Sequence, residues 1–279
     1  MFSTFRRIPV ANRPIAIFDS GAGGLTVLRR AWALYPGEHL IYGADSCHFP
    51  YGSRSLDDVR TLFLRFLDFF KTQDVKAVII ACNTATAAAL ETAQARCDVP
   101  VIGVVYPGAE KAVKTTLNGR IGVLSTYATY ESGIYRRAIR HYDQKAEVIQ
   151  WPCPALVTMA ELGQTETRQA QLAVRECLDR VFPHDVDTVV LGCTHFPHME
   201  RIFYEEVGDR AVIVDPGYET AKHLQEVLGP LSAQPGGSLK FYTTGIARDF
   251  NRVSSSLWPN AVIDANSLVW TTRGYEIRP

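Results

Sequence analysis

The chain of 279 residues lacks an excess of charge of either sign. Lysine and arginine together number 29, and so do aspartate and glutamate, so the formal net charge is zero. Proteins that bind nucleic acid or an anionic membrane surface usually show a basic excess or a basic patch. The balanced charge therefore gives no sign of either partner, and we expect neither nucleic acid nor a membrane to bind this protein.

A long apolar run is also missing. The chain starts with Met1–Pro9, which includes two arginines and has no continuous apolar stretch of the signal-peptide type. The most apolar early stretch, residues 62–70, is interrupted by Arg65 and Asp68, and it is too short and too charged to span a bilayer. We expect this stretch to form a buried amphipathic helix, and we expect a cytoplasmic protein.

The six cysteines include no Cys-x-x-Cys pair, which argues against a structural zinc site or a thioredoxin-like centre. They stand at Cys47, Cys82, Cys97, Cys153, Cys177 and Cys193. Because a reducing cytoplasm disfavours disulfides, we expect all six thiols to be free. Each is then either a small buried hydrophobic residue or a reactive thiol.

Short apolar segments alternate with longer helix-like stretches along the chain. The expected strands are continuous runs of Val, Ile and Leu, which is typical of parallel strands covered on both faces. The alternation predicts an α/β fold with doubly wound sheets. The expected strands cover residues 14–18, 39–42, 77–80, 99–105, 120–124, 147–150, 188–191 and 211–214, with a further strand from 241; the expected helices cover 25–34, 56–72, 84–95, 131–141, 166–180 and 220–228, and the clearest loop is 229–237.

Two short segments share one design. Residues 78–84 and 189–195 each consist of an apolar strand, a small residue, a cysteine and then polar side chains. We interpret them as parts of two similar α/β lobes, each of which places a cysteine at the carboxyl end of a strand. Ligands of open α/β sheets bind beyond those ends. Cys82 and Cys193 are therefore the thiols with functional placement, and we expect the other four to be buried filler.

Two thiols can carry out a specific kind of chemistry. A thiol with a pKa of about 8.5 can act as a base when deprotonated and as an acid when protonated. Removing the α-proton of an amino acid on one face and returning a proton on the other inverts its configuration. Two cysteines that face each other across a cleft would supply the two groups that this reaction needs.

Polar residues at other strand ends could assist the thiols. Asp19 ends the first expected strand and His195 lies two residues beyond Cys193, and either could hold a proton or stabilise a thiolate. Taken alone, Asp19 could equally be a helix cap and His195 an ordinary loop residue. The glycine loop 19–24 fits neither the dinucleotide nor the Walker pattern, so it is either an anion site at a helix start or only a tight turn.

Four motifs, in this order and spacing, resemble the signatures of bacterial glutamate racemases. They are Asp19-Ser-Gly-Ala-Gly-Gly-Leu-Thr26, Pro50-Tyr-Gly52, Ala81-Cys-Asn-Thr-Ala-Thr86 and Gly192-Cys-Thr-His-Phe-Pro197. The resemblance extends from about residue 15 to about residue 250. It implies a first lobe of residues 14–107 and 217–279, a second lobe of residues 108–216, and an active site between them. It also implies a small-molecule substrate, glutamate, no metal or pyridoxal phosphate, and production of D-glutamate for peptidoglycan. It allows a homodimer.

The resemblance also assigns roles to individual residues. It makes Cys82 and Cys193 the paired catalytic thiols, assisted by Asp19, His195 and Glu161. The substrate would be held by Asp19, Ser20, Tyr51, Gly52, Asn83, Thr84, Thr194 and His195. The chain departs from the family pattern at Tyr106, at residues 158–160 and at residues 215–220.

Other functions remain open at this point. The same scaffold could racemise aspartate or another amino acid. A hydrolase could use Cys193 as nucleophile with His195 as base, although such a reading leaves Cys82 unused. A binding protein with this fold and no turnover is the third alternative.

Overall fold

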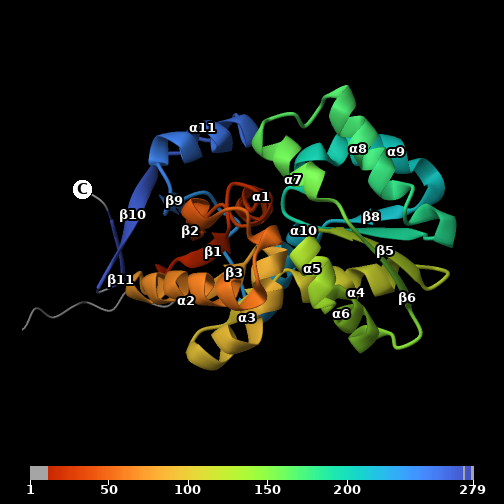
Figure 1. Cartoon of the computed structure of the whole chain (residues 1–279). Coiled ribbons are helices and arrows are strands. Elements are labelled where there is room, and N and C mark those ends of the chain that lie inside the picture. The colour runs from red at the N-terminus through yellow and green to blue at the C-terminus, as the bar shows by residue number, and fades with distance from the viewer. Residues whose placement is uncertain (1–11, 273, 278–279) are drawn as a thin grey trace, which may run out of the picture.

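The computed structural model describes residues 12–272 and 274–277, which form two mainly parallel sheets side by side (Figure 1). The first has seven strands in the order β11-β10-β9-β2-β1-β3-β4, in which β11 runs antiparallel to β10. Its strands are β1 (Ile15–Asp19), β2 (His39–Ala44), β3 (Ala77–Ile80), β4 (Val101–Gly103), β9 (Ser238–Thr243), β10 (Ala265–Thr271) and β11 (Gly274–Ile277). The expectation about a targeting segment concerns residues 1–9, which lie outside the described residues.

The second sheet repeats the topology of the first. Its order is β6-β5-β7-β8, which matches β2-β1-β3-β4 strand for strand. Its strands are β5 (Arg120–Ser125), β6 (Glu147–Pro152), β7 (Thr188–Gly192) and β8 (Val212–Val214). Cys82 follows β3 and Cys193 follows β7, so each cysteine comes after the third strand of its lobe. This equivalence confirms the predicted pair of similar lobes.

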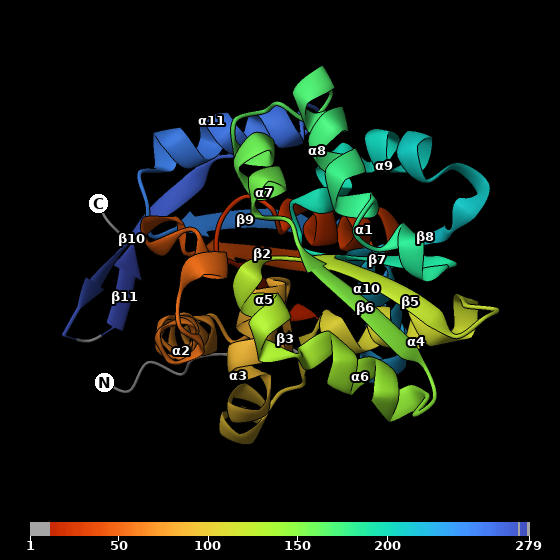
Figure 2. The same cartoon turned by 45° about the vertical axis from the view of Figure 1, so that its right-hand side comes forward.

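Helices cover both faces of each sheet, as predicted for a doubly wound fold (Figure 2). In the first lobe they are α2 (Leu56–Thr72) and α3 (Asn83–Arg96) on one face, and α1 (Leu25–Leu34), α10 (Pro216–Leu228) and α11 (Ala247–Leu257) on the other. In the second lobe they are α4 (Val105–Thr115) and α6 (Ile134–Tyr142) on one face, and α7 (Pro154–Glu161), α8 (Arg168–Leu178) and α9 (Glu200–Val207) on the other. Each face carries its own hydrophobic cluster.

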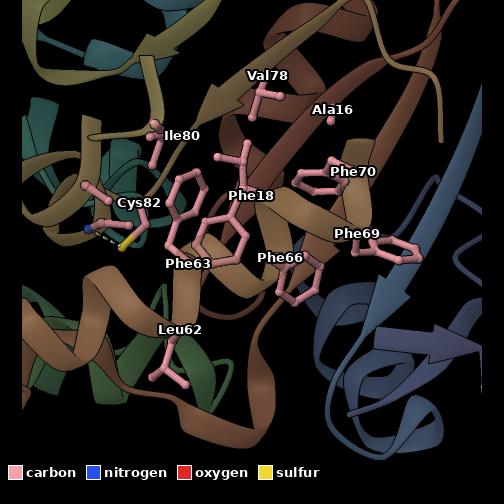
Figure 3. Packing of buried hydrophobic residues seen from close by; sticks show 14 of the residues in the cluster. Ala16, Phe18, Leu62, Phe63, Phe66, Phe69, Phe70, Val78, Ile80 and Cys82 are labelled. Carbon is pink, nitrogen blue, oxygen red and sulfur yellow. Dashed lines mark hydrogen bonds between the residues drawn. The ribbon is translucent and has the colours of Figure 1, made fainter. Parts of the chain in front are cut away.

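The alternation of side chains along β1 shows how one strand serves two cores. Phe18 points into the cluster under α2 and α3, whereas Ile17 points into the cluster under α1. The Phe18 ring lies 4.9 Å from the ring of Phe63 and 5.1 Å from that of Phe66, measured between centroids. Figure 3 shows these rings packed together, with Cys82 at the edge of the same cluster. The core thereby holds the start of the Cys82 turn in place.

Two secondary-structure predictions were wrong in detail. The strand predicted for residues 99–105 ends at Gly103, and helix α4 starts at Val105. The β-branched residues of this segment favour a strand, but a helix from Val105 onward buries Val105 and Ala109 against the second lobe. The helix predicted for 131–141 is two helices, α5 (Tyr127–Ser132) and α6, because Gly133 between them has a φ of 63°.

Other predictions about organisation are confirmed or stay predictions. Residues 229–237 form a connection between α10 and β9, as expected. The predicted lobe limits stay predictions: the limit at 107/108 falls inside α4, and the limit at 216/217 falls at the start of α10. Among the described residues, no helix combines the length and the apolar character that crossing a membrane requires.

Replacing Phe66 tests the aromatic core beneath β1. Phe66 is fully buried and its ring contacts those of Phe18, Phe70 and Tyr275. Phe66→Ala should lower the free energy of unfolding by about 3–5 kcal/mol, measured by urea denaturation. The exposed Thr61→Ala on the same helix is the control and should change it by less than about 0.5 kcal/mol. A loss below about 1 kcal/mol for Phe66→Ala would contradict the packing.

Candidate active site

Cys82 and Cys193 line one cavity between the two lobes. Cys82 is the N-cap of α3, and its Sγ accepts a hydrogen bond from the Ala85 amide at 3.4 Å. Cys193 follows β7 directly and precedes the short helix η5 (Phe196–Met199). The cavity has a volume of about 190 Å³, and both cysteines are buried with 6% and 5% of their surface exposed. The geometry thus joins the two residues, 111 positions apart, that the sequence pattern singled out.

Both lobes contribute walls to this cavity. Besides Cys82 and Cys193, seven predicted site residues line it: Ser20, Tyr51, Gly52, Asn83, Thr84, Thr194 and His195. Asp19 and Glu161 lie behind the cavity wall, where they are hydrogen-bonded to Thr194 and His195. The sequence analysis did not assign a role to the remaining lining residues, which are Phe49, Pro50, Ser53, Thr126, Tyr127, Pro154, Val157 and Thr158. Thr126 carried one usable signal, since it stands at the carboxyl end of a predicted strand.

Asp19 and Ser20 stand beside Cys82. The Cys82 Sγ lies 3.9 Å from the Ser20 hydroxyl. Burial and the nearby Asp19 carboxylate raise the pKa of the Cys82 thiol to about 12. Burial also raises the pKa of Asp19 to about 6, although the charge of His195 and hydrogen bonds from Gly21 and Thr194 oppose this. Cys82 is therefore a protonated thiol at neutral pH and becomes a strong base once it loses its proton.

Cys193 has a histidine beside it instead. His195 Nδ1 lies 3.8 Å from the Cys193 Sγ, and His195 Nε2 lies 2.7 Å from Glu161 Oε1. Burial alone would lower the pKa of His195, but its hydrogen bonds to Cys193 and Glu161 raise that pKa well above the ordinary value. A protonated His195 stabilises a thiolate on Cys193. The two sides of the cavity thus differ in charge.

Hydrogen bonds from the opposite lobe hold each cysteine turn. After Cys82, the Asn83 Oδ1 accepts from the Tyr135 hydroxyl at 2.6 Å, and Thr84 and Thr126 share a hydrogen bond of 3.0 Å. After Cys193, the Thr194 hydroxyl donates to Asp19 Oδ2 at 3.1 Å. These contacts fix the position of one thiol relative to the other, because each turn is tied to the lobe that carries the other cysteine.

Glycines allow the two lobes to approach closely at the cavity. A Cβ on Gly23 would lie 2.5 Å from the His195 ring, and a Cβ on Gly52 would lie 2.7 Å from the Thr126 Cβ. Both contacts cross from one lobe to the other. The glycine-rich motif therefore serves close interlobe packing against His195, a role beyond the tight turn or anion site that its sequence suggested.

The expectation that all six thiols are free is wrong for one pair. Cys153 and Cys177 form a disulfide, with their Cα atoms 6.2 Å apart. Cys153 precedes α7 and Cys177 lies in the last turn of α8, and these helices pack together on one face of the second sheet. Because the contact comes from helix packing, the chain separation of 24 residues gave no sign of it. Cys47 is free but exposed, so it is not buried filler, and Cys97 is partly buried.

Comparison with known proteins places the chain in a family. Residues 26–224 match the model of the Asp/Glu/Hydantoin racemase family. The chain belongs to this family. It is therefore an enzyme, an isomerase that acts on amino acids.

Several racemases of this family resemble the chain closely. A glutamate racemase from Symbiobacterium thermophilum is 46% identical over 260 residues, which is 91% of this chain and 94% of that protein. The crystal structure of the glutamate racemase isoform RacE1 from Bacillus anthracis has a TM-score of 0.88 at 34% identity and covers 92% of this chain and 97% of its own. A glutamate racemase from Francisella tularensis, solved in complex with D-glutamate, has a TM-score of 0.85 at 30% identity and covers 93% of this chain and 98% of its own.

Asp19 gives a prediction about stability and pH. Its pKa is about 6 in the folded protein against an ordinary value of 3.8, so folding favours the protonated carboxyl. The contribution of Asp19 to the free energy of unfolding is complete below about pH 4. It is lost as the pH rises through 6, where the buried carboxyl ionises. Asp19→Asn, which cannot ionise, should raise the free energy of unfolding at pH 8 by about 1–3 kcal/mol relative to wild type.

The measurement is urea denaturation of both proteins at several pH values. The stabilising effect of Asp19→Asn should level off above about pH 7 and vanish near pH 4. Asp249→Asn, which changes an exposed carboxylate in the first turn of α11, is the matched control and should not show this profile. An Asp19→Asn effect that is independent of pH would show that Asp19 does not carry a buried charge at neutral pH.

Proposed function

We propose that the chain interconverts L- and D-glutamate by moving the α-proton between Cys82 and Cys193. One observation carries this proposal: two thiols from equivalent positions of the two lobes line a single buried cavity. The 30–46% identity to glutamate racemases supports glutamate as the substrate. We infer that the D-glutamate supplies peptidoglycan synthesis and that the enzyme works in the cytoplasm.

The reaction needs two proton transfers and no change of oxidation state. A thiolate on one side removes the proton from Cα, and the electron pair of the C–H bond stays on the carbon. The thiol on the other side then gives its proton to the opposite face of that carbon. The substrate leaves with inverted configuration, and the protonation states of the two cysteines are exchanged. One cysteine accepts a proton and the other donates one, so the proposal invokes no cofactor.

The charges around each thiol suit one direction of transfer. Cys193 has the protonated His195 beside it, which favours a thiolate there, whereas Cys82 keeps its proton because its pKa is about 12. The resting enzyme is then ready to remove a proton on the Cys193 side and to deliver one from the Cys82 side. After turnover the charges are reversed, and Asp19, with a pKa of about 6, stands where it can exchange a proton near Cys82.

The walls of the cavity offer groups for the substrate's charges. The backbone amides at the start of α3, just after Cys82, favour a carboxylate because a helix N-terminus carries a partial positive charge. Three hydroxyl-bearing residues, Ser20, Thr84 and Thr126, line the same space. Fixing the α-carbon between the two sulfur atoms makes orientation a large part of the rate enhancement.

A second candidate function has one observation in its favour. Cys193, His195 and Glu161 form a hydrogen-bonded chain of the kind that activates a nucleophilic thiol in hydrolases. An ester substrate that leaves an acyl group on Cys193 would support it. It assigns no task to Cys82, whereas the racemase mechanism uses both cysteines. A chiral chromatography panel of amino acids, with aspartate and glutamate first, separates this function from racemisation and glutamate from aspartate.

Replacing one cysteine at a time tests the two-base mechanism. Cys82→Ala and Cys193→Ala should each abolish racemisation of glutamate, because inversion in either direction passes through both thiols. Each variant keeps one base, so each should still exchange the α-proton of one enantiomer with solvent. The two variants should exchange opposite enantiomers. The measurement is deuterium incorporation at Cα of D- and L-glutamate in D₂O, followed by NMR.

The control is Cys97→Ala, a free cysteine away from the cavity, which should racemise glutamate at the wild-type rate. Racemisation by either single variant at the wild-type rate would rule out the two-cysteine mechanism. Exchange of the same enantiomer by both variants would show that the two thiols do not act on opposite faces.

A further inference from the structure

A loop of the first lobe supplies five consecutive residues to the cavity wall. Phe49–Ser53, which includes the short helix η3 (Tyr51–Ser53), lines the cavity beside both cysteines. The sequence resemblance makes Tyr51 a substrate-binding residue. In the structure, however, the Tyr51 side chain is buried, and its hydroxyl donates a hydrogen bond away from the catalytic cysteines, to Asp45 Oδ2 at 2.5 Å.

Asp45 is a buried carboxylate at the point where β2 ends and this loop begins. It is 0% exposed. Three side chains donate to it: Tyr51, Thr244 at 2.6 Å and His48, whose Nδ1 lies 2.9 Å from Oδ1. Its backbone amide donates to the Asp19 carbonyl at 3.0 Å. Charge from Asp45 adds to burial in raising the pKa of Tyr51 well above its ordinary value, so the Tyr51 hydroxyl stays a donor.

The donors come from two distant parts of the chain. His48 and Tyr51 belong to the loop, whereas Thr244 follows β9 and also accepts a hydrogen bond from the Cys47 amide at 3.1 Å. A buried carboxylate is tolerated only when it is fully hydrogen-bonded. The loop conformation that satisfies Asp45 is the same conformation that lays Phe49–Ser53 along the cavity. None of Asp45, His48 and Thr244 lines the cavity.

We propose that Asp45 is a positioning residue that holds the Phe49–Ser53 wall in its substrate-binding form, with Tyr51 and Thr244 acting through it. Tyr51 then contributes to binding by fixing the loop, and its hydroxyl does not contact the substrate. Loosening this anchor should weaken substrate binding more than it slows the proton transfers. Hydrogen bonds outside the loop hold Cys82, Cys193 and His195, and the loop adds to them the packing of the Phe49 ring, 5.7 Å from the His195 ring between centroids. The inference rests on the proposed function only for its kinetic readout.

Thr244→Val gives the sharpest test, because it removes one hydroxyl outside the cavity. KM for glutamate should rise about three- to tenfold with kcat within about twofold, which is the range that the loss of one typical hydrogen bond supports. Thr244→Ser keeps the hydroxyl and should restore the wild-type KM. Tyr204→Phe, which removes an exposed hydroxyl on α9, should leave both constants unchanged.

A double-mutant cycle separates anchoring from direct contact. Tyr51→Phe and Asp45→Ala should each raise KM, and the double variant should be no worse than Asp45→Ala alone, because removing the carboxylate already removes the acceptor of the Tyr51 hydroxyl. If the effects of the two changes on KM multiply, or if Thr244→Val keeps the wild-type KM, the proposal is wrong.

A readout that needs no activity accompanies the kinetics. Hydrogen exchange followed by mass spectrometry should show faster exchange of the amides of residues 46–54 in Thr244→Val than in wild type and in Thr244→Ser. Unchanged exchange in that segment would overturn the anchor. If wild type does not racemise glutamate, the proposed function fails, and the exchange measurement still decides whether Asp45 holds the loop.

Discussion

The position of one sulfur atom relative to the other depends on hydrogen bonds that cross between the lobes. Thr194, next to Cys193, donates to Asp19 in the first lobe, and Asn83, next to Cys82, accepts from Tyr135 in the second. Each cysteine turn is thus shaped by the lobe that carries the other cysteine. A two-base mechanism requires such reciprocity, because an α-carbon between two sulfurs tolerates little change in either distance. The glycines at the interface belong to the same constraint, since a side chain there would push the lobes apart.

In the proposed reaction, the exclusion of water has opposite effects on the carbanion that forms and on the thiolate that acts as base. A dry cavity strengthens the interactions that stabilise a developing carbanion, but it also makes a thiolate harder to form. The surroundings of the two cysteines differ in this respect. His195 supplies a positive charge beside Cys193, whereas on the other side the pKa of Cys82 is left at about 12 and Asp19 titrates near 6. In the proposed mechanism this asymmetry keeps the Cys82 thiol protonated and sets the positive charge of His195 beside Cys193.

Much of the architecture could be predicted from the sequence because it depends on local pattern. The continuous apolar runs gave the parallel strands, and the shared design around Cys82 and Cys193 gave the two lobes. Where prediction failed, packing between distant segments decided the outcome. The β-branched residues between 99 and 105 favour a strand, yet Val105 begins a helix because the second lobe buries it. The pairing of Cys153 with Cys177 depends on how α7 lies against α8, and no motif records that contact.

At the site, the sequence could not predict the direction in which the side chains point. Residue types at strand ends singled out the thiols, Asp19 and His195, and the structure places all four in or directly behind one cavity. They could not say which way a side chain faces. Tyr51, predicted to hold substrate, lines the cavity, and its hydroxyl donates to a buried carboxylate six positions earlier. Unsatisfied charge is more costly inside a protein than an unused hydroxyl is at a cavity. The burial of Asp45 therefore determines where Tyr51 points, and only the folded chain shows that Asp45 is buried.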